Sequence, residues 1–457
     1  MTQSSPASHS TAAVIGAGIA GMTAAYRLQG AGFKTTVFES RDRVGGRIWT
    51  IRKGDFLMDL GTAVYLGTYR DAIALIHEVG LDSELVEVPV IMGLPRNGRQ
   101  NYIDLTSPLR SGIGTKALSW SAKRKAVRLA ADVFRFRAGL GYDTYDAIAE
   151  IDTETVREYC RRALNEEILQ YLARPLVSGT WVADDNDTSV ALLHWSIRNM
   201  LVKSVYNLTS GVVGLPQKLA TFVDTRLSHP VSNVTDNGRS VEVTYSEGPG
   251  GAERTETFDT CVIAATAQPA LQMYSQMDEN TRGLYESTRY RRLGSIVVGL
   301  SERPDDRATF SMIPPQDDPD TIAVIADHNK APGRAPAGKG LLTVLLSHEY
   351  LNRTDDRSDD DILDYSMDRA RKYYGTKLTG EIEQYAVVRW PESVPTIDRG
   401  RFKRIAAYLR RIDPTTRVQF ASDLDRIPGL NGGLVSGHEA AARVINLFSE
   451  RTAATVR

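Results

Sequence analysis

Short apolar runs and longer stretches of mixed character alternate at the amino end of the chain. Residues 12–15 form a continuous apolar run, residues 16–21 are rich in glycine, and an apolar-rich stretch then continues to about residue 29. A second short run covers residues 35–38. Short apolar runs are typical of strands buried in a parallel sheet, and the longer stretch predicts a helix. The pattern therefore predicts a strand, a glycine turn, a helix and a second strand.

The rest of the chain divides into a helix-rich and a strand-rich part. A helical period of apolar residues predicts a helix whose buried face holds Ala126, Leu129, Ala130, Val133 and Phe134. Later in the chain we expect a half-exposed strand at 241–245, buried strands at 258–265, 295–300, 321–325 and 341–346, and a helix at 359–374. The segment 327–340 is rich in Pro, Gly and Lys and is expected to be a mobile connection.

Composition narrows the class of protein. The 457 residues are enough for two or three domains, and 42% of them are apolar. With 55 Lys and Arg against 56 Asp and Glu, the chain does not have the charge of a nucleic-acid binder. Its apolar runs fall far short of the ~20 residues that a membrane span requires. Residues 1–10 lack the basic and apolar regions of a signal peptide and are expected to be a disordered tail.

The two cysteines indicate neither a disulfide framework nor a zinc site. Cys160 and Cys261 lie far apart and have no neighbouring histidine. We therefore expect a reducing, cytoplasmic location. The sequence also shows no metal-ligand cluster, no Ser-His-Asp order and no Walker-type lysine.

The glycine turn after the first strand has the spacing of a dinucleotide site. Gly16 permits the tight turn, Gly18 lets a pyrophosphate approach the start of the helix, and Gly21 lets helix and strand pack closely. Glu39 ends the second strand about 20 residues beyond the glycines, where an acid accepts hydrogen bonds from a ribose diol. An acid at that position disfavours a 2′-phosphate.

A second glycine pair follows at once. Gly45 and Gly46 lie between Arg43 and Arg47, so a close backbone approach is combined with cations that match phosphate.

These motifs resemble those of the flavin amine oxidase superfamily, which includes monoamine and polyamine oxidases, porphyrinogen oxidases and phytoene desaturases. Segments near 58–62, 211–220, 229–231, 258–265, 420–423 and 432–437 are similar to further family motifs in the expected order. The resemblance implies FAD as the cofactor. The residues that it places on FAD are Gly16, Gly18, Ala20, Gly21, Glu39, Ser40, Arg41, Gly45, Gly46, Arg47, Leu60, Gly61, Thr62, Val231, Ala265, Asp423, Gly433, Leu434 and Val435.

The resemblance also implies an architecture of the α/β class. A Rossmann-like FAD-binding domain is expected in three separated pieces, 11–75, 211–291 and 405–457. The inserts between them, a helix-rich 76–210 and a sheet-and-helix 292–404, would form an α+β substrate domain with a mostly antiparallel sheet.

The reaction implied is hydride transfer from a substrate carbon to the flavin. In amine oxidases of this family a lysine and an aromatic residue stand near the flavin, where our alignment has Ser295 and Gly429. Segments 174–184 and 389–401 resemble those of porphyrinogen oxidases. We therefore expect desaturation of a lipophilic, cyclic small molecule, with O2 or another electron acceptor. The alternatives are oxidation of a C–N bond to an imine, and a non-catalytic binding protein similar to Rab GDP-dissociation inhibitors.

Candidate pocket residues are drawn from this comparison, and each has a plainer interpretation as a core residue. They are Trp181, His194, Trp195, Ser295 and Trp390. His194 is either a general base or a core histidine. The basic, amphipathic stretch 116–137 is either the solvated face of a helix or a weak contact with an anionic membrane surface.

Overall fold

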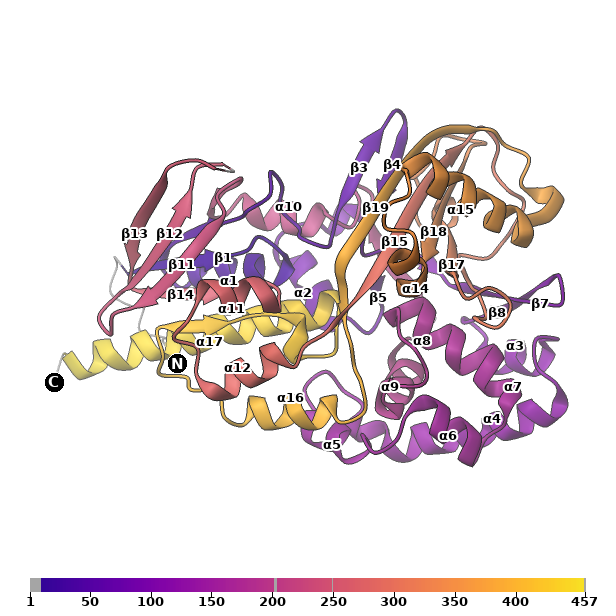
Figure 1. The fold of residues 1–457 in the computed structure, drawn as a ribbon, viewed down its shortest axis with the longest axis horizontal. Helices are drawn as coiled ribbons and strands as arrows, with labels where there is room; N and C mark the ends of the chain where they lie inside the picture. The colour runs from indigo at the N-terminus through magenta and orange to yellow at the C-terminus, as the bar shows by residue number, and fades with distance from the viewer. Residues whose placement is uncertain (1–9, 201–203, 249, 456–457) are drawn as a thin grey trace.

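The computed structural model describes residues 10–200, 204–248 and 250–455, and one half of the molecule is built on a sheet of five parallel strands (Figure 1). Alternate residues of the central strand enter two different cores: Ala13 and Ile15 face one, and Ala12 and Val14 the other. Both faces of the sheet are therefore buried, which explains its continuous apolar strands. The strands, in spatial order, are β10 (Asp224–Arg226), β2 (Lys34–Phe38), β1 (Thr11–Ile15), β14 (Thr260–Ile263) and β20 (Val418–Phe420).

Helices and a small sheet complete this half of the molecule. The expected first helix is α1 (Ile19–Gly30), and it packs against the long α17 (Leu430–Thr455). The predicted alternation at 241–245 is confirmed, since Val241, Val243 and Tyr245 are buried while Glu242 is exposed. The other elements are α2 (Arg70–Glu78), α10 (Gly214–Ala220), β11 (Val231–Asp236), β12 (Val241–Ser246), β13 (Glu253–Phe258), α11 (Ala267–Met273), α12 (Glu279–Glu286) and α16 (Arg401–Leu409).

A second sheet of seven strands lies in the other half of the molecule (Figure 1). Its neighbours pair antiparallel except for one parallel pair, so the expected mostly antiparallel sheet is confirmed. In order the strands are β19 (Ile382–Pro395), β15 (Tyr290–Leu300), β18 (Gly340–Leu346), β17 (Thr321–Ala326), β16 (Phe310–Met312), β7 (Ile91–Arg96) and β8 (Arg99–Asp104).

The two faces of this sheet meet different partners. Ile296 and Val298 of β15 pack with the helices α14 (His348–Arg353) and α15 (Asp359–Tyr374), which confirms the expected helix at 359–374. Val297 points the other way and joins a cluster with residues of β4 (Phe56–Asp59), which pairs with β3 (Thr50–Lys53). This second face lies toward the segments that resemble FAD-binding motifs.

The helix-rich part agrees with expectation except in which face is buried. α4 (Trp120–Phe136) buries Ala122, Leu129 and Val133, whereas Ala130 and Phe134, expected in the core, are exposed. The buried stripe is therefore rotated around the helix relative to the expected one, and Phe134 is 63% exposed. The other helices here are α3 (Pro108–Gly114), α5 (Tyr145–Glu150), α6 (Val156–Ala163), α7 (Glu166–Ile168), α8 (Arg174–Trp181) and α9 (Val190–Met200). Three short strands, β5 (Tyr65–Leu66), β9 (Ser204–Leu208) and β6 (Leu85–Pro89), connect them to the rest.

The segment 327–340 is not the free connection that its composition suggested. It begins with α13 (Asp327–Lys330), and both Lys330 and Arg334 are buried. Two buried cations need carboxylate partners, and these hold the segment in the core.

The five-stranded sheet takes its strands from three separated parts of the chain, as a discontinuous domain requires. The domain boundaries given above stay a prediction. Residues 1–9 of the expected disordered tail lie outside the described residues, whereas Ser10 accepts a backbone hydrogen bond from Lys34. Of the helices in the described ranges, none is both long and apolar enough to cross a bilayer.

Candidate active site

The turn between β1 and α1 leaves open space at one glycine and none at the other two. Gly16 has φ +103°, and a Cβ there would lie 2.7 Å from the carbonyl oxygen of Ala264. A Cβ on Gly21 would lie 1.9 Å from the carbonyl oxygen of Gly16. At Gly18, the residue before the helix, a Cβ would meet nothing within 4 Å. The free amide groups and positive dipole end of α1 therefore open onto space that suits an anion.

Glu39 closes one side of this turn. Its buried carboxylate accepts hydrogen bonds from the backbone N–H groups of Ala17 at 2.7 Å and Arg41 at 2.9 Å. The backbone carbonyl of Glu39 accepts from the N–H of His229 at 2.7 Å, which brings the start of β11, with Val231, to this edge. The residues predicted to contact the ribose and the adenine therefore lie at the same edge of the sheet.

The second glycine pair lies against the first. The N–H of Gly45 donates to the carbonyl of Ala17 at 2.8 Å. Gly46 has φ +59°, and a Cβ there would be 3.2 Å from the Cα of Gly18. A Cβ on Gly45 would lie 2.2 Å from the carbonyl oxygen of Ile48, so neither position of this pair has room for a side chain.

Arg47 and Asp423 form a two-point ion pair in the site. Two nitrogens of Arg47 donate to the two carboxylate oxygens of Asp423 at 2.6 and 3.1 Å. Burial disfavours the guanidinium charge, but the Asp423 carboxylate outweighs that effect and raises the pKa of Arg47. The pair joins the early and late parts of the chain across the site.

The loop after β4 connects the site to the second sheet. The N–H of Thr62 donates to the carbonyl of Arg47 at 3.2 Å, and a Cβ on Gly61 would be 2.0 Å from that oxygen. The carbonyl of Leu60 accepts from the indole N–H of Trp390 at 2.8 Å. The predicted residues 60–62 thus lie between Arg47 and the strand β19.

The start of α17 also reaches the site. A Cβ on Gly433 would be 3.3 Å from the Ile19 side chain and 3.8 Å from both Ala20 and Asp423. Farther along α17, a Cβ on Gly437 would be 2.1 Å from the carbonyl of Ala20. Leu434 is buried and Val435 is half-buried on the same turn, and Ala265 follows Ala264 beside the first glycine turn.

A buried cluster of four charged side chains stands directly behind residues 60–62, and the sequence analysis missed it. Asp59 accepts from Lys330 at 2.9 Å, from Arg334 at 3.2 Å and from Thr50 at 2.6 Å. Lys330 also pairs with Asp327 at 2.5 Å. The four charged side chains are at most about 1% exposed. Although burial would raise it, Lys330 and Arg334 hold the pKa of Asp59 below its ordinary value.

Only the Asp59 half of this cluster left a signal in the sequence. Asp59 ends an apolar run, so a buried carboxylate was to be expected, and such a group needs cationic partners. Lys330 and Arg334 were assigned to a mobile segment instead.

Two of the five pocket candidates share one face of the second sheet. Leu293 of β15 pairs with Trp390, and Ser295 pairs with Val388, so these side chains point toward the same side. Trp390 packs with Leu293, Ile322 and other apolar residues. The Ser295 hydroxyl is buried and has no hydrogen-bond partner among the described residues.

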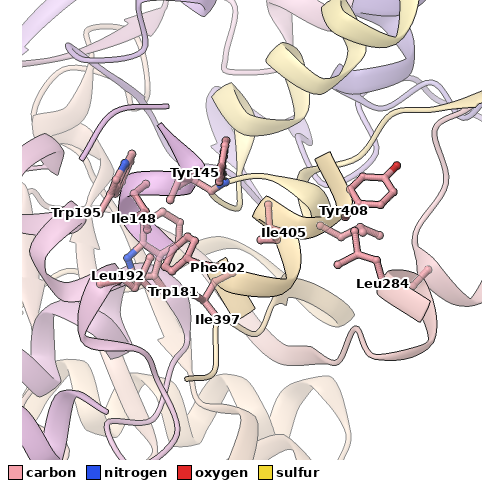
Figure 2. Packing of buried hydrophobic residues seen from close by; sticks show 14 of the residues in the cluster. Tyr145, Ile148, Trp181, Leu192, Trp195, Leu284, Ile397, Phe402, Ile405 and Tyr408 are labelled. Atoms are coloured by element: carbon pink, nitrogen blue, oxygen red, sulfur yellow. Dashed lines mark hydrogen bonds between the residues drawn. The ribbon is translucent and has the colours of Figure 1, made fainter. Parts of the chain in front are cut away.

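The other three candidates lie in the helical core. Figure 2 shows Trp181 and Trp195 among apolar neighbours such as Ile148 and Phe402. Their indole N–H groups donate to Ser196 at 2.8 Å and to Gly141 at 3.0 Å respectively. Satisfied donors inside an apolar cluster favour the interpretation as core residues.

His194 belongs to the same core. Its ring packs against Phe136 and Tyr159 with centroids 6.0 and 5.0 Å away. Burial lowers its pKa to about 4, so the ring is neutral near pH 7. Neither ring nitrogen has a hydrogen-bond partner within the described part of the chain. These observations favour a packing role over a general base.

A family model described as flavin containing amine oxidoreductase matches residues 19–445. The chain belongs to this family. It is 22% identical to the coproporphyrinogen III oxidase of Staphylococcus aureus over 95% of this chain and 98% of that protein. It is 28% identical to polyamine oxidase 3 of Oryza sativa over 56% of this chain and 51% of that protein. The structure of cyclohexylamine oxidase from Brevibacterium oxydans superposes with a TM-score of 0.75 at 17% identity, covering 97% and 99% of the two chains.

Family membership makes the chain an FAD-dependent oxidoreductase. The site fits this cofactor: open space at Gly18, a close backbone approach at Gly46, a helix amino end and a buried acid are the features that a dinucleotide diphosphate and its ribose require. The prediction of an FAD enzyme is confirmed, and the non-catalytic alternative has no support.

Proposed function

We propose that this enzyme removes hydride from a C–H bond of a lipophilic, cyclic substrate of the porphyrinogen type. Loss of a proton from the same ring system then leaves a further double bond in it. The similarity to a coproporphyrinogen III oxidase over nearly the whole of both chains supports this substrate class. That similarity carries the proposal, and the apolar cluster of Trp390, Leu293 and Ile322 beside residues 60–62 is the part of this chain that would face a large ring.

Two positions on this face argue against a simple amine. Ser295 stands where amine oxidases of the family have a lysine, in our alignment, and its surroundings are apolar. Gly429 has φ +102°, a backbone conformation that an aromatic residue adopts only under strain. A ring that orients an amine is therefore disfavoured there. A large substrate loses less, because its own apolar contacts fix the reacting carbon.

The residues of this chain would bind and orient the two reactants. FAD, when bound, accepts the hydride. The hydrogen bond from Trp390 to Leu60 fixes the indole next to residues 60–62, and Leu293 and Ile322 extend the apolar wall. A substrate ring held on that wall would present one carbon at a constant distance to the flavin.

We also propose how the predicted residues divide the cofactor between them. Gly18, Gly46 and the start of α1 would hold the pyrophosphate and Glu39 the adenosine ribose, while Asp423 with Arg47 would face the ribityl chain. The remaining contacts would come from Gly16, Ala20, Gly21, Ser40, Arg41, Gly45, Leu60, Gly61, Thr62, Val231, Ala265, Gly433, Leu434 and Val435.

Anaerobic bleaching of the bound flavin tests the substrate class. The purified holoenzyme is mixed in a stopped-flow instrument with coproporphyrinogen III, protoporphyrinogen, cyclohexylamine or putrescine. We expect a porphyrinogen to bleach the flavin at least about tenfold faster than either amine, which corresponds to about 1.4 kcal/mol in the barrier. Faster reduction by an amine would refute the proposal and support the second candidate, oxidation of a C–N bond, which the similarity to a polyamine oxidase favours.

The electron acceptor and location complete the proposal. We infer that O2 reoxidises the flavin, so admitting air to the bleached enzyme should restore its colour within the time of one turnover. A reducing cytoplasm is supported by Cys160 and Cys261, which are free and buried.

A further inference from the structure

The most exposed large apolar side chains of the described residues lie on α4 and on the end of α3. They are Ile113, Trp120, Val127 and Phe134, at 62%, 70%, 68% and 63%. The other exposed members of this class in the described residues, Phe222, Leu227 and Ile382, reach only 42%. Apolar side chains that are this exposed and gathered in one region mark a contact surface, whereas single exposed apolar residues are common on any protein.

Three of the four form a straight stripe along α4. Trp120, Val127 and Phe134 are seven residues apart, so at about 100° per residue they fall within about 40° of one another around the helix. Leu129 and Val133, which are buried, lie on the opposite side. The helix therefore has two apolar stripes, and only one of them faces the protein core.

Ile113 extends the stripe beyond the helix. The ammonium group of Lys123 donates to the backbone carbonyls of Ile113 at 2.6 Å and Thr115 at 2.7 Å, which ties the end of α3 to the first turns of α4. Lys123 also lies over the Trp120 ring, 4.8 Å from its centroid. At the other end of α4, Arg137 lies 3.8 Å above the Phe134 ring.

Positive charge borders the stripe on both sides. Residues 116–137 contain seven cationic side chains and one carboxylate, although the whole chain has a net charge of −1. Arg124, Arg128 and Arg135 project on one side of the stripe and Lys123 on the other, by the same helical geometry. The carboxylate, Asp132, is already held by Arg128 and Tyr159.

We propose that α4 and the end of α3 form a docking surface for an anionic lipid bilayer, with the helix lying flat in the interface. An apolar stripe with Trp and Phe, bordered by a row of arginines on one side and by Lys123 on the other, is the pattern of interfacial helices, and acidic headgroups complement its charge. A second copy of the chain fits less well, because a two-fold contact would place two strongly basic surfaces against each other. The surface lies at the end of the molecule away from α17, so docking leaves the five-stranded sheet free (Figure 1).

The test uses flotation of the purified holoenzyme with phosphatidylcholine vesicles that contain either no anionic lipid or about a third phosphatidylglycerol. We expect binding to the anionic vesicles only, weakening as salt is raised. The double variant Trp120→Ser/Phe134→Ser should bind at least about tenfold more weakly, whereas Phe222→Ser, a matched change outside the surface, should bind like the wild type. Equal flavin content and equal circular dichroism establish that the variants are folded.

Three results would overturn the proposal. They are no flotation with anionic vesicles at low salt, equal flotation of the double variant and wild type, or a dimer in sedimentation that the double variant alone loses. The last result would assign the surface to a second copy of the chain.

Discussion

Replacing Asp59 by asparagine should destabilise the protein by about 3–5 kcal/mol, because it removes one charge from a buried cluster and leaves the others unbalanced. Asp59 faces both Lys330 and Arg334, and the three side chains are at most about 1% exposed. After the change, Asp327 alone would balance two buried cations. For a cooperative unit of about 200 residues this loss corresponds to a fall of about 10 °C in Tm.

Thermal unfolding of the variants by calorimetry measures this effect. Asp55→Asn is the matched control, since Asp55 lies on the same hairpin but is exposed. The double variant Asp59→Asn/Lys330→Met removes one charge of each sign, so it should lose at least about 2 kcal/mol less than the sum of the two single changes. A Tm for Asp59→Asn within a degree of the control would refute the reasoning, and so would strict additivity in the double variant.

Lowering the pH should remove the contribution of the Asp59 carboxylate to stability. The pKa of Asp59 is held below its ordinary value in the folded protein. Its contribution to stability is therefore complete above the unfolded pKa, about 4, and is lost as the pH falls through the folded value. The Tm values of the wild type and Asp59→Asn should converge as the pH is lowered below about 4.

Three further substitutions test the site and the core. Gly18→Trp should abolish FAD binding while leaving the fold intact, since a side chain there meets open space in the protein. Gly30→Trp, at the far end of the same helix, should keep its flavin. The flavin-to-protein ratio after purification measures both effects. Glu39→Ala should weaken FAD by about 1–3 kcal/mol, or ~5- to 150-fold in Kd, measured by fluorescence titration of the apoprotein, and exposed Asp42→Ala should not. His194→Met should flatten the dependence of the free energy of unfolding on pH. Burial lowers the pKa of His194 from 6.5 to about 4. The contribution of the neutral ring to stability, at most about 3 kcal/mol, is therefore complete above pH 6.5 and is lost toward pH 4. Identical slopes in wild type and variant would contradict that assignment.

The parts of the fold with short-range signals could be predicted from the sequence. The glycine spacing after β1 and the acid after β2 follow from backbone geometry alone, so strand, turn, helix and Glu39 were placed within a residue or two. The same holds for the alternation in β12.

What failed depended on partners far away in the sequence. Lys330 is buried because Asp59, 271 residues earlier, neutralises it, and composition near residue 330 contains no trace of that contact. The spacing of Phe134 from the other apolar residues of α4 matches a helical period. Its side chain nevertheless lies outside the buried face, because the neighbouring helices determine which face of α4 is covered. Trp181 and Trp195 are residues of the type that lines ligand pockets. Their indole N–H groups nevertheless find hydrogen-bond acceptors inside the helical core.

The strand order of the parallel sheet also constrains how a ribosome can deliver this protein. β1 is synthesised before its partner β14, and β14 in turn pairs with β20, whose residues are translated only after the second insert. Until then the nascent chain exposes an unpaired edge on β14, a surface open to aggregation. The predicted cofactor site also stays incomplete, because Asp423 and Gly433 have not yet been synthesised. Cofactor capture is therefore expected only after residues 418–433 have left the ribosome, and a chaperone has most to protect during the long translation of the inserts.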